Sequence, residues 1–139
     1  PSGTILMAIY GSPTVGRLGV LTAEGACNQA ALAIVGGEIP QAVLYYMLVE
    51  LRAHFNSIAQ GAAQQNISKH TVEETEVVCP PIELCRAAYE TIAPFWEQRK
   101  TLYLVTSGLR ATRDYLLPRL ISGEIDVTDL DIALPVVAT

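Results

Sequence analysis

The feature that most constrains the fold of this chain is a long apolar stripe in its second half. From residue 82 onwards, apolar side chains recur at alternating spacings of three and four residues, the repeat of a helix that packs against another helix. One set of heptad positions (88, 95, 102, 109 and 116) is entirely apolar, and the other set (85, 92, 99, 106, 113 and 120) is polar at three places. The spacing predicts one helix over residues 82–121, which would be about 60 Å long.

The end of this helix is marked by a proline and a glycine. Pro118 is expected to prevent continuation of the helix, and Gly123 to supply the left-handed residue that caps it. Residues 124–127 are predicted to form a short strand, and residues 128–139 a frayed tail. A helix of this length is too long to lie across a body made of the first 81 residues. It is therefore expected to project and to meet another helix.

The first part of the chain predicts a small mixed domain of strands and helices. Apolar or β-branched runs bounded by glycine-containing turns predict short strands at residues 5–10, 17–21 and 29–35. Residues 41–55 follow a proline and carry apolar side chains at helical spacing, which predicts one helix, and Gly61 is expected to end that unit.

The segment after this helix contains a capping residue and a β-branched run. Ser68 is expected to cap a short helix, and residues 75–79 predict a strand that two prolines close. The expected fold class is therefore α+β: a body at residues 1–81, a long projecting coiled-coil-type helix at 82–121, and a short strand with a tail at 122–139.

Composition and charge limit the functions open to the chain. Half of the residues are hydrophobic (50%), which is high for a monomer and indicates that a partner buries part of the surface. The net charge of −5 argues against binding nucleic acid by bulk electrostatics, so contact with a polyanion must rest on a few well-placed groups. The apolar run at residues 39–49 is too short to span a membrane, and the first residues lack the pattern of a signal peptide.

The three cysteines do not form a recognisable site. Cys27, Cys79 and Cys85 show neither CxxC spacing nor the spacing of a zinc site, and no motif pairs them with a histidine. They are expected to be buried, reduced thiols, which fits a cytoplasmic protein. No catalytic residue, metal ligand or cofactor is predicted.

Five segments, taken in order, resemble the DNA-specificity subunit of type I restriction–modification enzymes: GTILMAIYGSPTVGRLGV, CNQAALAI, GAAQQNIS, VCPPIELCRAAYETI and LLPRLISGEIDV. The resemblance runs over residues 3–127 and covers the later part of one target-recognition domain and one spacer helix. The chain is too short for two recognition domains and begins on a strand that normally lies well inside one. It is therefore expected to be a fragment, a truncated gene product or a half-size subunit, without the base-reading residues that would lie upstream.

The resemblance implies a subunit that catalyses nothing. Each of its two recognition domains reads one half of a split site in double-stranded DNA, and two antiparallel helices set the separation of the domains. The same helices dock modification subunits, which methylate adenine with S-adenosylmethionine, and through them the restriction subunit. The alternative is a helical assembly module, which self-associates or binds the modification subunit and has little DNA binding of its own.

The loop at residues 10–17 is the first candidate DNA contact, because backbone N–H groups and hydroxyls in a glycine-bounded loop can hold phosphate. An ordinary tight turn is the alternative. The amides at residues 28–29 and 64–66 suit adenine or phosphate, although amides that pin loops by bonding backbone groups are favoured. Lys69 is expected either to contact a DNA phosphate or to lie on a solvated surface. The candidate DNA contacts are Gly11, Ser12, Thr14, Gly16, Arg17, Gln65 and Lys69.

The apolar stripe of the long helix is the second candidate site, a surface for self-association or for the modification subunit. The expected interface residues are Ile92, Phe95, Arg99, Leu102, Leu109, Arg113 and Leu116. Arginines at such positions fix the register and orientation of paired helices at some cost in stability. Packing of the stripe onto the body of the same chain is the alternative, and the length of the helix argues against it beyond residue 102.

Overall fold

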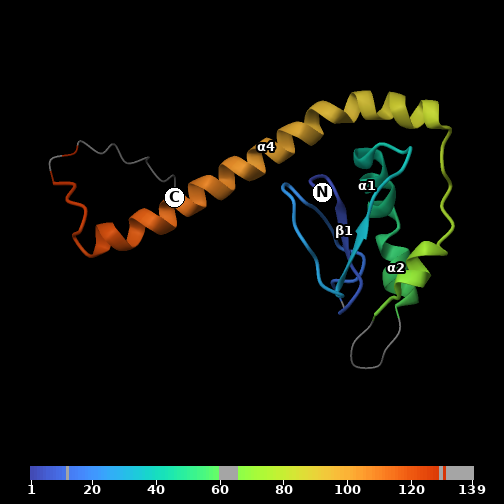
Figure 1. Cartoon of the computed structure of the whole chain (residues 1–139), viewed down its shortest axis with the longest axis horizontal. Helices are drawn as coiled ribbons and strands as arrows, with labels where there is room; N and C mark the ends of the chain where they lie inside the picture. Colours follow the sequence, from blue (N-terminus) through green and yellow to red (C-terminus); the bar gives the residue numbers. More distant parts are fainter. Residues whose placement is uncertain (12, 60–65, 129, 131–139) are drawn as a thin grey trace, which may run out of the picture. The chain divides into compact units, whose positions relative to one another are not determined.

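The structure is a computed structural model that describes residues 1–11, 13–59, 66–128 and 130. It divides into two compact units, residues 1–100 and residues 101–139. The first unit contains the sheet, three short helices and the first half of the long helix α4 (Figure 1). The second half of α4 belongs to the second unit.

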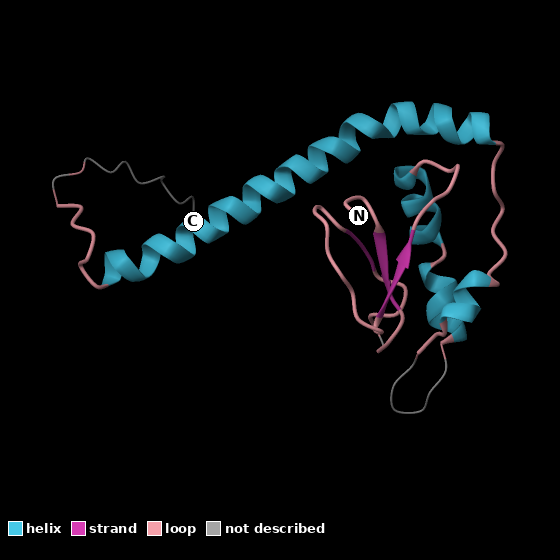
Figure 2. Cartoon of the chain, viewed as in Figure 1, coloured by secondary structure: helices cyan, strands magenta, loops and turns pink. Residues whose placement is uncertain are grey.

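A three-stranded antiparallel sheet in the order β2-β1-β3 forms the centre of the first unit (Figure 2). Strand β1 (Ile5–Ala8) pairs with β2 (Leu18–Val20) and with β3 (Ala31–Ile34). Met7 lies opposite Leu18 on one side and opposite Leu32 on the other. All three strands expected in the first 35 residues are confirmed, each shorter than the run that predicts it.

Two helices follow the sheet where the sequence predicts one. Helix α1 (Gln41–Glu50) ends at Leu51, and α2 (Arg52–Ile58) begins directly after it. The side chain of Gln41 ties the start of α1 to the end of β3, because its Nε2 donates to the Ile34 carbonyl and its Oε1 accepts from the Gly36 N–H. The end expected at Gly61 lies outside the described residues.

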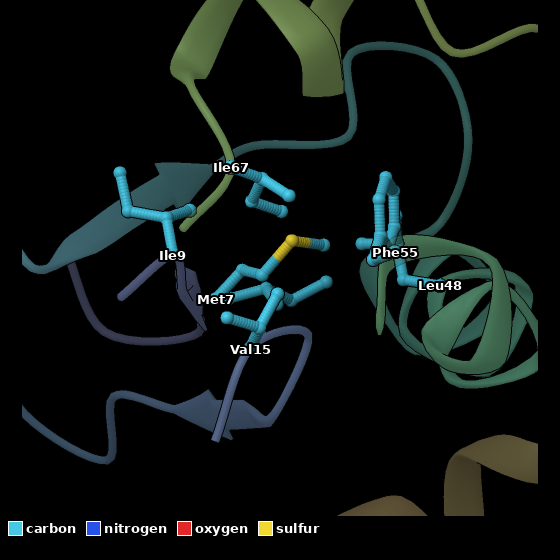
Figure 3. Packing of buried hydrophobic residues seen from close by; sticks show 7 residues of the cluster. Met7, Ile9, Val15, Leu48, Phe55 and Ile67 are labelled. Atoms are coloured by element: carbon cyan, nitrogen blue, oxygen red, sulfur yellow. The ribbon is translucent and has the colours of Figure 1, made fainter. Parts of the chain in front are cut away.

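The hydrophobic core lies between one face of the sheet and these two helices. Figure 3 shows Met7 reaching from β1 toward Phe55 of α2, with Val15 and Ile67 on either side. Met7 and Val15 are fully buried, and Phe55 is only 1% exposed. Burying a side chain of this size stabilises the fold by roughly 1.5–3 kcal/mol. The buried cluster consists of Ile5, Met7, Ile9, Val15, Leu48, Phe55 and Ile67.

Helix α3 (Lys69–Glu73) begins at the predicted cap, since the Ser68 hydroxyl oxygen accepts a hydrogen bond of 3.0 Å from the Thr71 N–H. The strand predicted over residues 75–79 is wrong: this segment is extended, but it pairs with none of the described strands. Its two valines are exposed, Val77 at 47% and Val78 at 94%. A β-branched run forms a strand only where a neighbouring backbone supplies hydrogen-bonding partners.

Helix α4 (Ile82–Ile121) confirms the long helix and its bounds. Pro118 does not stop it, because a proline so close to the end removes only one helical hydrogen bond, to a carbonyl on an exposed turn. Gly123 supplies the cap, with a left-handed φ of 74° and its N–H donating to the Leu120 carbonyl at 3.2 Å. None of the described helices has the length and apolar character needed to cross a membrane.

The strand predicted over residues 124–127 is also wrong. The Asp126 carboxylate accepts hydrogen bonds from the backbone N–H and the hydroxyl of Thr128, at 2.9 and 2.5 Å, which closes a local turn instead. The hydroxyl bond, followed by the backbone bond, lowers the pKa of the Asp126 carboxyl below its ordinary value. Of the tail predicted at 128–139, only Thr128 and Leu130 are among the described residues.

An aromatic cluster joins the first half of α4 to α1 within the first unit. The indole of Trp96 meets the Tyr45 ring edge-on, with 5.3 Å between centroids. The Arg99 guanidinium lies over both rings, 4.8 Å from the Tyr45 centroid and 4.5 Å from that of Trp96. Contacts of these two kinds each contribute on the order of 0.5–1 kcal/mol. We call Tyr45, Trp96 and Arg99 the aromatic clasp.

Trp96 is the only tryptophan of the chain, so its fluorescence reports directly on this clasp. Tyr45→Ala removes the ring that covers one side of the indole. We expect red-shifted emission, stronger quenching by acrylamide and a loss of about 1–2 kcal/mol in the free energy of unfolding. The control is Tyr103→Ala, which truncates a tyrosine of α4 that is 60% exposed. Equal quenching in the two variants would show that the clasp does not form in solution.

Candidate functional site

The loop at residues 10–17 is closed on β1 by its own backbone. The Gly16 N–H donates to the Ala8 carbonyl and the Ala8 N–H donates to the Arg17 carbonyl, both at 2.9 Å. Inside the loop, the Thr14 N–H donates to the Gly11 carbonyl at 2.7 Å. Gly11 and Gly16 have left-handed φ values of 81° and 75°, which the tight closure requires and which other residues rarely adopt. Ser12 lies outside the described residues.

This closure changes what the loop can offer to a ligand. Five of its backbone N–H groups donate to protein oxygens, namely those of Gly11, Thr14, Val15, Gly16 and Arg17. The Thr14 hydroxyl likewise donates to backbone carbonyls of the same loop. The exposed side chain of Arg17 has no ion-pair partner among the described residues. Any anion at this loop is therefore met by a cationic side chain rather than by a cradle of N–H groups.

The segment around Asn66 is brought to this loop from far along the chain. The Gly11 N–H donates to Asn66 Oδ1 at 3.2 Å, and Tyr10 and Asn66 form an isolated β-bridge. The interpretation that such amides pin loops is thereby confirmed for Asn66. It is confirmed also for Asn28, whose Oδ1 accepts a bond of 3.1 Å from the Ala30 N–H. Gln65 lies outside the described residues.

A hollow of about 770 Å³ lies beside this junction. Its apolar wall consists of Ile9 just after β1, Ile58 at the end of α2 and Ile67 before α3. Its polar wall includes Lys69 at the start of α3. The Lys69 ammonium pairs with Glu73 at 3.2 Å, and both side chains are well exposed. Exposed pairs of this kind contribute little, so Lys69 stays free to turn toward another anion. The lining residues are Ile9, Tyr10, Ile58, Asn66, Ile67, Ser68, Lys69 and Thr71.

Two residues of α2 that the sequence analysis missed also hold the loop. Arg52 Nη2 donates to the Pro13 carbonyl at 3.4 Å, and Asn56 Nδ2 donates to the Val15 carbonyl at 2.8 Å. A spacing of four residues places the two side chains on one face of a helix. That spacing is readable from the sequence, but the loop that this face meets is set by tertiary packing.

The second candidate site, the stripe of α4, is largely open. Phe95, Leu102 and Leu109 are 69%, 57% and 65% exposed, and Leu116 is 37% exposed. Ile92 is half-buried. The two arginines of the stripe are engaged elsewhere: Arg99 belongs to the aromatic clasp, and Arg113 pairs with its neighbour Asp114 at 2.6 Å.

The cysteines differ from expectation. Only Cys85 is buried, while Cys27 lies in the exposed connection between β2 and β3 and Cys79 in the extended segment before α4. The expectation of three buried thiols is therefore wrong, because two of them fall in connections that pack against little. Within the described ranges, no group of three or more His, Cys, Asp or Glu side chains could hold a metal ion.

Comparison with solved structures finds the same fold in the crystal structure of a type I restriction–modification system S subunit from M. genitalium. The TM-score is 0.59 and the sequence identity is 22%, and the match covers 87% of this chain and 33% of that chain. No family model and no curated protein matches this chain. The expected α+β class with a long carboxyl-terminal helix is confirmed, and the chain spans only 33% of the length of the S subunit it resembles.

The crowding around Gly16 gives a test of the loop geometry. A Cβ at Gly16 would lie 3.2 Å from Arg52 Cγ and 3.4 Å from Phe55 Cβ, whereas a Cβ at Gly3 would meet nothing within 4 Å. Both glycines have left-handed φ values, so Gly3→Ala measures the backbone cost alone, about 1–2 kcal/mol. We expect Gly16→Ala to lower the free energy of unfolding by about 1 kcal/mol more. Equal losses in chemical denaturation would contradict the packing of α2 on the loop.

Proposed function

We propose that this chain is a DNA-recognition subunit, or part of one, of a type I restriction–modification system. In this proposal it catalyses nothing and positions the modification subunit, and indirectly the restriction subunit, on a split site in double-stranded DNA within the cytoplasm. The observation that carries the proposal is the shared fold with an S subunit over 87% of the chain. The order of elements supports it, since a small α+β body is followed directly by one long helix with an apolar stripe.

In this proposal the body, residues 1–81, is part of a target-recognition domain that contacts DNA. The proposed contacts are Gly11, Ser12, Thr14, Gly16, Arg17, Gln65 and Lys69. The closed loop favours contact through side-chain charge, with Arg17 and Lys69 as the groups that neutralise phosphates. Phosphate contacts position a protein on DNA without reading its sequence.

In this proposal the helix, residues 82–121, serves as the spacer and as the dimerisation surface. Several turns of α4 carry apolar side chains that are more than half exposed. Contact of such side chains with water is unfavourable, so packing against a second helix is favoured. Each such side chain contributes roughly 1.5–3 kcal/mol on burial, against an association cost of roughly 4–15 kcal/mol. Five apolar positions from each of two copies are enough to favour an antiparallel pair.

A helical assembly module with little DNA binding is the second candidate. It is favoured by the net charge of −5 and by the loop N–H groups that already bond protein oxygens. Binding of duplex DNA, measured with and without a modification subunit, separates the two functions. Binding that appears only with the modification subunit, and that survives loss of Arg17, would favour the assembly module.

We expect the isolated chain to bind duplex DNA weakly and with steep salt dependence, because few cations meet few phosphates. Arg17→Ala should lower affinity alike on duplexes of unrelated sequence and reduce the slope of log affinity against log salt by about 0.9. Fluorescence anisotropy over a series of salt concentrations measures both quantities. A variant that changes the preferred sequence while keeping overall affinity would make Arg17 a base-reading residue instead.

We expect self-association through the stripe of α4, as an antiparallel dimer. Leu102→Glu/Leu109→Glu places charges at the centre of the stripe and should give a monomer with unchanged helix content by circular dichroism. Leu104→Glu/Ala111→Glu adds the same charge, also seven residues apart, on the opposite face of the helix, and should stay dimeric. Sedimentation velocity separates the outcomes. A wild type that stays monomeric at high micromolar concentration, with its helix intact, contradicts the dimer.

A further inference from the structure

We infer that Arg52 and Arg17 together form a phosphate-binding pair for the backbone of duplex DNA, with Arg52 as a contact residue that the loop itself holds in place. This inference rests on the proposed function and names a second residue of the same site. The pair flanks Gly16, where the absence of a side chain lets the stem of Arg52 lie against the loop.

The basic residues of the body gather at one end of the sheet. Residues 1–70 contain three basic side chains, and all three adjoin the loop at 10–17. Arg17 lies in the loop, Arg52 donates to it, and Lys69 lines the hollow beside it. Glu24 and Glu38 lie beyond the ends of β2 and β3 that pair with Ile5, at the opposite end of the sheet. Lys69 is paired with Glu73, so the positive charges at the loop that lack an ion-pair partner in the described structure are those of Arg17 and Arg52.

Arg52 is anchored without being neutralised. Its Cγ lies 3.2 Å from the position that a Cβ at Gly16 would occupy, and its Nη2 donates to the Pro13 carbonyl at 3.4 Å. The residue is exposed, and no carboxylate pairs with it in the described structure, including Glu50 at the end of α1. One nitrogen thus meets the loop in a long hydrogen bond, the stem packs beside Gly16, and the remaining N–H groups are available to an anion.

Arg17 has a fixed backbone and an open side chain. Its N–H donates to the Thr14 carbonyl and its carbonyl accepts from the Ala8 N–H, both at 2.9 Å. Two guanidinium groups without a carboxylate partner among the described residues lie at one loop, and each can pair with a phosphate through a charge-assisted hydrogen bond. Because the loop backbone is already fixed, binding of the anion costs the side-chain freedom of Arg17 but no further ordering of the loop.

Charge and scaffolding are the two roles that Arg52 could have, and they respond differently to substitution. Arg52→Gln keeps part of the aliphatic stem and an amide donor for the Pro13 carbonyl but removes the charge. Arg86→Gln, at an exposed arginine in the first turns of α4, makes the same change of net charge elsewhere and serves as the matched control. Thermal unfolding of each variant checks the scaffold.

The experiment measures affinity of the full-length chain for two duplexes of unrelated sequence over a salt series, by fluorescence anisotropy. We expect Arg52→Gln to weaken binding of both duplexes about fivefold to tenfold and to reduce the salt slope by about 0.9. The Arg17→Gln/Arg52→Gln double variant should reduce the slope by about twice that amount. Arg86→Gln should leave the slope unchanged.

Several results would overturn the inference. If Arg52→Gln behaves like Arg86→Gln while Arg17→Gln still lowers the slope, Arg52 is not a contact and the proposed function stands. If Arg52→Gln weakens binding and lowers the unfolding temperature but leaves the slope unchanged, Arg52 only supports the loop. If Arg52→Gln lowers the affinity for only one of the two duplexes, Arg52 is a base-reading residue. A wild type that binds no duplex even at the lowest salt overturns both the pair and the proposed function.

Discussion

The contact between Phe55 of α2 and Met7 of β1 is the interaction on which the rest of the first unit depends. It buries the largest side chain of the core against the central strand, and it fixes the rotation of α2 about its own axis. Arg52 and Asn56 lie on the same short helix, so their position follows from that rotation. With Phe55 turned inward, both polar side chains reach the carbonyls of the loop at 10–17. The apolar core thereby places the polar groups that hold the loop.

The loop illustrates how a rigid scaffold limits its own chemistry. A glycine-rich turn with free N–H groups can cradle phosphate. Here the N–H groups of Thr14, Val15, Gly16 and Arg17 bond to backbone carbonyls, and that of Gly11 bonds to Asn66 from a distant segment. The result is a rigid platform that carries charge on side chains. Phosphate contacts of that kind give affinity and register on DNA, whereas sequence reading needs groups that enter a groove.

Local signals account for what the sequence predicts correctly. The three strands, the Ser68 cap, the Gly123 cap and the bounds of α4 all depend on residues within one or two turns of each other. The wrong predictions, the strands at 75–79 and 124–127, need a partner strand from elsewhere in the chain, which β-branched composition cannot supply. The contact of α2 with the loop is equally non-local, so Arg52 and Asn56 could not be assigned to the site from their spacing alone.

The aromatic clasp has a consequence for any helix that pairs with α4. The heptad pattern places Arg99 and Arg113 at equivalent positions, and either could fix the register of a pair. Arg99, however, lies on Tyr45 and Trp96, and its guanidinium cannot stack there and also enter a helix–helix interface. In a pair that leaves the clasp intact, Arg99 stays packed against α1, and the apolar positions beyond it are Leu102, Leu109, Leu116 and Leu120. Arg113 is then the arginine left to set the register, and it must exchange its bond to Asp114 for one to the facing helix. Because that ion pair is exposed and costs little to break, the exchange is energetically accessible.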